Sequence, residues 1–256
     1  VTIFGAATSN EFLASDCTVR LDLDQDNSSG LPGGDYTFTV CGRGPVFISD
    51  ISDAEVYSGY ALDSLRFTLT PAYPNEILSA GLPLPTGLSL SGQGSASLVI
   101  HNNGTAQYAD FQSVLRTVTW QYTGPGSAPT GLHGVTAILF AAGGRRDTAV
   151  ALLDIREPVS AGRDSSVTLC ADATPFNLTS LLSPDAALGG MWQPALPGTL
   201  FNPTTQQSGS FRYIVPGGEC PPDTAVITIE VHPLPVFSLG SDADLCAGDT
   251  LVLETS

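Results

Sequence analysis

Three aspartates at alternate positions mark the part of the sequence best suited to chemistry. The stretch LDLDQDNSSGLPGGDY (21–36) carries Asp22, Asp24 and Asp26, then an asparagine, two serines and a glycine-rich turn. Alternate residues of a strand share one face, so we expect three carboxylates on one side. They repel each other unless a cation or solvent screens them, and calcium takes about six to eight oxygen ligands. Further acids follow in the same region: Asp35, Asp50, Asp53, Glu55 and Asp63.

A solvated acidic strand is the alternative interpretation of these aspartates. Charges on such a strand discourage edge-to-edge pairing with other chains. The spacing also lacks the closing glutamate of an EF-hand loop. The sequence therefore leaves both a calcium site and a solvated strand open.

Nothing in the sequence indicates an enzyme. It contains no GxSxG, HExxH, SxxK or GxxxxGK motif. His101, His133 and His232 are isolated from one another, and the absence of lysine excludes a lysine Schiff base. The 25 acidic residues leave open a glycosidase, which needs a pair of carboxylates. We expect a non-catalytic protein.

The net charge of −16 restricts the classes of partner. Nine arginines and no lysine stand against 18 aspartates and 7 glutamates. Nucleic acids and anionic membrane surfaces need basic partners, so neither is expected to bind. No run of about 18 apolar residues suggests membrane insertion. The chain does not begin with methionine and shows no signal peptide, so we interpret it as a processed protein or a piece of a larger one.

Short alternating or β-branched stretches separated by turns predict an all-β protein. Strands are expected at 17–23, 36–40, 65–70, 96–101, 116–122, 134–140, 148–155, 166–170, 209–215 and 223–232. The glycines of 141–146 predict a hairpin tip. Apolar residues at helical spacing in 107–115 predict one or two helical turns.

An internal repeat divides the second half of the chain. EPVSAGRDSSVTLCAD (157–172) aligns with LPVFSLGSDADLCAGD (234–249) at a period of about 77 residues, as the Pro-Val pairs and Cys170 and Cys246 show. We therefore expect a module at 157–233 and the start of a further, incomplete one at 234–256. Residues 1–15 are interpreted as a strand or linker.

None of the five cysteines belongs to a CxxC pair, which disfavours a zinc or thioredoxin-like motif, and disulfides between them would favour an oxidising compartment. Their spacing suggests the local pairs Cys17–Cys41 and Cys170–Cys220 and leaves Cys246 with a partner in the missing part of its repeat. Buried free thiols are the alternative. We expect a secreted or cell-surface protein.

A family resemblance covers most of the chain. The segment 16–56, LDSLRFTLT (62–70), LPTGLSL (84–90) and ADFQSVLRTVTWQYTG (109–124) resemble a cadherin-like repeat of large bacterial surface proteins, often of the Bacteroidetes type, and the likeness ends near 156. AGRDSSVTLC, GGMW with Trp192, SGSFRYIV and CPPDTAVITIEV resemble the Ig-like or PKD-like repeats of the same proteins. The resemblance implies tandem β-sandwiches, cadherin-like at 16–156 and Ig-like at 157–233.

The resemblance also implies a calcium site and a structural role. Acids at strand ends bind calcium in such repeats, which makes Asp24, Asp26, Asp50, Asp53 and Asp63 candidate ligands, although the DxNDN linker motif of true cadherins is absent. Trp192 resembles a tryptophan packed on an inter-sheet disulfide. We expect a segment of an adhesin stalk or self-assembling surface fibre that contacts other copies, neighbouring repeats, or surface glycans or proteins. A polysaccharide-binding accessory region of a secreted enzyme is the alternative.

Overall fold

The computed structural model describes residues 18–236, 246–248 and 250. The chain divides into two compact units between Pro158 and Val159. The expected linker or strand at 1–15 lies outside the described residues, as do most residues of the repeat expected at 234–256. Over the described residues, no helix has the length and apolar character needed to span a membrane.

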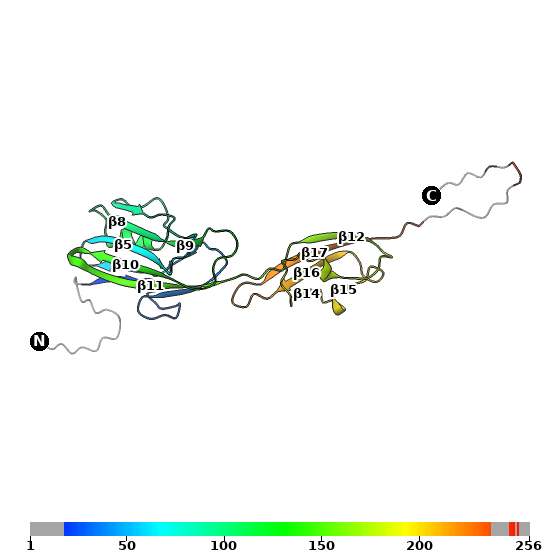
Figure 1. Ribbon diagram of the computed structural model, residues 1–256, viewed down its shortest axis with the longest axis horizontal. Coiled ribbons are helices and arrows are strands. Elements are labelled where there is room, and N and C mark those ends of the chain that lie inside the picture. The colour runs from blue at the N-terminus through cyan, green and yellow to red at the C-terminus, as the bar shows by residue number, and fades with distance from the viewer. Residues whose placement is uncertain (1–17, 237–245, 249, 251–256) are drawn as a thin grey trace. The chain divides into compact units, whose positions relative to one another are not determined.

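Besides a short 3-10 helix at Ala142–Gly144, eleven strands and one α-helix make up the described part of the first unit (Figure 1). They are β1 (Val19–Asp22), β2 (Tyr36–Cys41), β3 (Val46–Phe47), β4 (Glu55–Ser58), β5 (Leu62–Thr70), β6 (Glu76–Ser79), β7 (Leu88–Ser91), β8 (Ser97–Asn102), α1 (Tyr108–Leu115), β9 (Thr119–Tyr122), β10 (Gly131–Ala141) and β11 (Arg145–Arg156). A six-stranded sheet has the order β2-β11-β10-β5-β8-β7, and a three-stranded sheet has the order β3-β9-β6. β1 pairs with β4.

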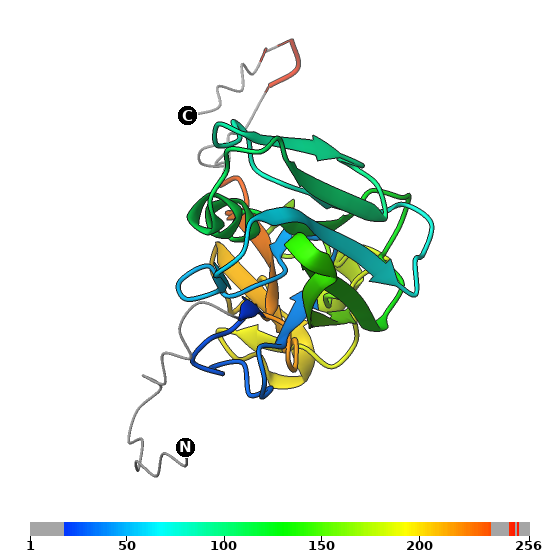
Figure 2. The same cartoon turned by 90° about the vertical axis from the view of Figure 1, so that its left-hand side faces the viewer.

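One apolar core holds the first unit together. Alternation places Leu65, Phe67 and Leu69 of β5 inward, and Trp120 of β9 is fully buried in the same cluster. Phe111 on α1 joins that core, so the helix covers part of it. α1, the green coil in Figure 2, also accepts a hydrogen bond through the Gln112 side chain from the Val56 amide of β4.

The second unit contains a four-stranded sheet and a two-stranded sheet. Its strands are β12 (Ser165–Cys170), β13 (Phe176–Asn177), β14 (Met191–Gln193), β15 (Leu200–Phe201), β16 (Gly209–Val215) and β17 (Asp223–His232). The four-stranded sheet has the order β12-β17-β16-β14, and β13 pairs with β15. Phe201, Phe211 and Ile227 lie in its core. The predicted fold class, all-β with successive β-sandwich units, is confirmed.

The predicted disulfide Cys170–Cys220 does not form. Cys220 is disulfide-bonded, but Cys170 is a free, exposed thiol in the described part of the chain. Cys170 lies opposite His232, whereas Cys220 precedes Asp223, the other end of β17. That strand spans roughly 30 Å at about 3.4 Å per residue, and the Cα atoms of a disulfide lie within about 7 Å of each other.

Two other predictions involving cysteine have different outcomes. Cys41 is disulfide-bonded, but Cys17 lies outside the described residues, so their pairing stays a prediction. Trp192 packs on the ring of Tyr213, with 5.1 Å between the centroids, and has no Cys170–Cys220 disulfide beside it. Trp192 therefore packs on an aromatic ring and not on the disulfide that the resemblance implied.

Candidate metal centre

Three carboxylates from two loops converge in the first unit. One ligand oxygen from each of Asp24, Asp50 and Asp53 lies within 4.8 Å of the other two. Oxygens that bind one calcium ion at about 2.4 Å can be separated by at most about 4.8 Å, so this spacing fits a single ion. Asp24 follows β1, and Asp50 and Asp53 precede β4, so the β1–β4 pair brings the two loops together.

The loop after β1 folds around the Asp24 side chain. This fully buried carboxylate accepts hydrogen bonds from the Ser28 amide at 3.0 Å, the Ser28 hydroxyl at 3.1 Å and the Ser29 amide at 2.8 Å. Aspartate often forms such local turns in place of an extended strand. Burial raises the pKa of Asp24, but the hydrogen bonds from Ser29 and Ser28 outweigh it and hold the pKa below its usual value.

Asp50 is held ionised in the second loop. Its carboxylate accepts hydrogen bonds from the Ser52 amide at 2.8 Å and the Ser52 hydroxyl at 2.5 Å, and from the Ser28 hydroxyl at 3.3 Å. The bonds from Ser52 are the main cause that lowers the pKa of Asp50 below its ordinary value. The Ser28 hydroxyl therefore lies between the Asp24 and Asp50 carboxylates and shares its one hydrogen between them.

Asp53 differs from its two neighbours. Its Oδ2 accepts a hydrogen bond from the Asp26 amide at 2.8 Å, but its Oδ1 is buried without a hydrogen-bond partner among the described residues. Burial, followed by repulsion from Asp26 and Asp50, raises the pKa of the Asp53 carboxyl. A buried carboxylate oxygen without a partner is costly, and a cation would stabilise it. The oxygen donors present therefore fit a calcium ion.

The predicted ligand set is only partly assembled here. The expectation that Asp22, Asp24 and Asp26 share one strand face is wrong, because β1 ends at Asp22 and the chain turns after it. Asp22 instead accepts a hydrogen bond from Arg20 at 2.7 Å, and Asp26 adjoins the cluster through its amide. Asp63 lies outside the cluster and lines a separate cleft.

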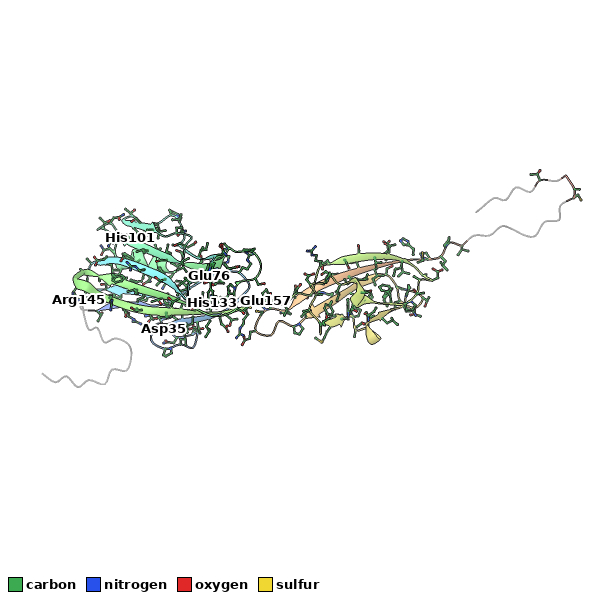
Figure 3. The ribbon with its side chains drawn as sticks, in the orientation of Figure 1. Asp35, Glu76, His101, His133, Arg145 and Glu157 are labelled. Carbon is green, nitrogen blue, oxygen red and sulfur yellow. The ribbon has the colours of Figure 1, made fainter. Side chains whose placement is uncertain are left out.

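A second buried polar group, the pair Glu76 and His133, was not predicted from the sequence. Their Oε1 and Nδ1 atoms lie 2.5 Å apart, and both residues are almost fully buried. Both are labelled in Figure 3. The pair joins β6 of the three-stranded sheet to β10 of the six-stranded sheet. Glu76 Oε2, His133 Nε2 and Trp120 Nε1 are buried without partners in the described part of the chain. Two positions separated by 57 residues gave no local signal.

Comparisons with known proteins find similarity only among solved structures. No family model matches the chain, and no curated protein sequence is significantly similar to it. Among solved structures, mouse clustered PcdhgC3 EC1-3 aligns at 10% identity and a TM-score of 0.27, covering 84% of this chain and 68% of that one. Clostridium thermocellum CbhA fibronectin(III)-like modules align at 11% identity and a TM-score of 0.26, covering 84% and 95%. Drosophila N-cadherin EC1-4 aligns at 11% identity and a TM-score of 0.24, covering 78% and 48%.

Proposed function

We propose that this chain is a structural segment of an extracellular repeat protein. In this account, the first β-sandwich binds one calcium ion through Asp24, Asp50 and Asp53. The observation that carries the proposal is the convergence of these carboxylates around the unpartnered Oδ1 of Asp53. The ion would join the loop after β1 to the loop before β4, so that the sandwich transmits force as a stiff unit.

The remaining features support an exported structural protein. Disulfide-bonded Cys41 and Cys220 are typical of secreted and surface proteins. The net charge of −16 favours divalent cations and solubility. The proposal therefore places the chain in a stalk or fibre of a large bacterial surface protein and assigns it no catalytic role.

Other copies of the chain are the proposed partners. Strands β12 and β14 form the two edges of the four-stranded sheet, and neither outer edge pairs with another described strand. Exposed edges allow β-strand addition by a second chain. Sedimentation velocity over a wide concentration range tests this part. Growing species support self-association, and a monomer at every concentration contradicts it.

A thermal melt tests the calcium site. We expect the non-reduced chain to melt higher in millimolar calcium than in EDTA. Binding at a hundredfold excess over Kd adds about 2.7 kcal/mol to the free energy of unfolding, which raises the melting temperature by roughly 8 °C for a unit of this size.

Asp53→Asn should lose the calcium-induced shift in melting temperature. Asp63→Asn is the matched control and should keep it, because Asp63 lies outside the cluster. Equal melting of the wild-type chain in EDTA and calcium would refute the site.

A further inference from the structure

A cleft of about 600 Å³ lies in the first unit, apart from the three clustered carboxylates. It is lined by residues of the turn between β4 and β5, the segment after β8 and the start of α1, including Tyr60, Asp63, Asn102, Gln107 and Tyr108. Its volume falls within the range of about 300–1,000 Å³ that is usual for small-molecule sites.

A β-bulge places Asp63 in this cleft. In the β5–β10 ladder, Ser64 pairs with Phe140 and Leu62 pairs with Ala141, so Asp63 is the additional residue on β5. Bulges commonly redirect a side chain next to a binding site. The exposed Asp63 carboxylate has no hydrogen bond or ion pair among the described residues, so it can accept bonds from a ligand.

Two tyrosine rings in the cleft are held in place from outside it. The guanidinium of Arg145, labelled in Figure 3, lies 3.9 Å from the centroid of the Tyr60 ring. The Tyr108 ring packs against Tyr57 at 5.6 Å between centroids, and Tyr108 is 44% exposed. Each ring is therefore supported by a neighbour and contributes to the wall of the cleft.

Asn102 lines the cleft, and hydrogen bonds hold its side chain in place before any ligand binds. Its amide nitrogen donates to the carbonyls of Leu62 at 2.8 Å and Ala106 at 3.0 Å. Its Oδ1 accepts from the amides of Gly104 at 2.8 Å and Ala106 at 3.1 Å. This uses the full bonding capacity of the side chain, so the loop after β8 is tied to the start of β5 and the cleft is preformed.

We propose that this cleft binds a neutral saccharide unit. Its lining includes a carboxylate but no arginine, lysine or histidine, which disfavours an anionic ligand. The apolar face of a sugar ring can pack on Tyr60 and Tyr108, whose side chains combine an apolar ring with a hydroxyl. Its hydroxyls can donate charge-assisted hydrogen bonds to Asp63. This inference does not depend on the proposed calcium site.

Saturation-transfer-difference NMR with neutral oligosaccharides tests the inference. The probes are xylohexaose, cellohexaose, maltohexaose and mannohexaose, each added to the whole chain in EDTA. We expect transfer to at least one of them. Tyr108→Ala should then weaken binding about tenfold or more, because it removes an exposed aromatic face. Asp63→Asn should also weaken binding while leaving the calcium-induced melting shift intact.

Two matched controls keep the test decisive. Asp53→Asn removes a carboxylate of the acidic cluster and should leave saccharide binding unchanged. Phe38→Ala removes another exposed aromatic ring that does not line the cleft and should also have no effect. The inference is overturned if no probe binds, or if binding survives Tyr108→Ala in a chain that melts like the wild type. It is also overturned if the cleft binds tetramethylammonium and no saccharide.

Discussion

At the scale of single residues, the Asp53 carboxylate is the feature that distinguishes a cation-binding site from an ordinary acidic surface. Its neighbours Asp24 and Asp50 are stabilised in the ionised form by serine hydrogen bonds. Asp53 instead has a raised pKa and a buried oxygen without a partner in the described part of the chain. Without a cation, ionised Asp53 therefore opposes folding, and this cost is fully present only above its raised folded-state pKa.

Asp53→Asn is predicted to have opposite effects with and without calcium. In EDTA at neutral pH, the variant should melt higher than the wild type, because the uncompensated charge is removed and an amide can donate to the neighbouring carboxylates. In calcium, it should melt lower than the calcium-bound wild type. Melting curves of both proteins in the two buffers check this. A variant that melts below the wild type in EDTA would show that burial and charge repulsion at Asp53 do not destabilise the fold.

The buried pair Glu76–His133 should behave as one unit. His133→Phe leaves the Glu76 carboxyl buried without its hydrogen-bond partner, and leaving a buried polar group unsatisfied in this way costs about 1–3 kcal/mol. Replacing both residues, Glu76→Leu with His133→Phe, should restore most of the loss, because neither position then carries a buried polar group. Urea unfolding of the single and double variants measures the difference. Equal losses in both would mean that the two side chains are not coupled.

At the scale of elements, strands with regular alternation were predictable and contacts through loops were not. The expected strands 209–215 and 223–232 match β16 and β17, and the expected helix at 107–115 matches α1 (Tyr108–Leu115). Strands of two to four residues, such as β3 and β6, are too short for a periodic signal. The Asp24 turn overrode the alternation of 21–26, because its carboxylate bonds to the next two serine amides.

Asp24 and Asp50, in the two loops that meet at the cluster, determine how acid affects the stability of the first unit. Asp24 and Asp50 have folded-state pKa values below their usual ones. Their contribution to stability is therefore present above their unfolded-state pKa values, about 4, and is lost as pH falls through the folded values. Asp24→Asn should flatten this acid dependence, measured by melting in EDTA between about pH 6 and 2. An unchanged slope would contradict the role given to the serine hydrogen bonds.

At the scale of the whole molecule, two separate cores lie in two units divided at Pro158 and Val159. The internal repeat indicated a module that begins at 157, and each such module needs its own apolar core. Disulfide pairing was not predictable, since the direction of β17 separates the positions of Cys170 and Cys220. Local spacing along the chain does not carry that information.

We expect calcium to affect one unit and not the other. Calorimetry should resolve two transitions in EDTA, and millimolar calcium should raise only the transition of the unit that contains Asp24, Asp50 and Asp53. The second unit has none of these residues and should melt at the same temperature in both buffers. Equal shifts of both transitions would indicate a general effect of salt on a chain with a net charge of −16.

Calorimetric titration of calcium into the EDTA-stripped chain tests the central claim most directly. The account predicts saturable binding of one ion per chain, lost in Asp53→Asn and retained in Asp63→Asn. It is contradicted if the wild type shows no saturable binding at millimolar calcium, or if wild type and Asp53→Asn titrate alike. In that case, Asp24, Asp50 and Asp53 form an acidic loop that serine hydrogen bonds hold together without an ion.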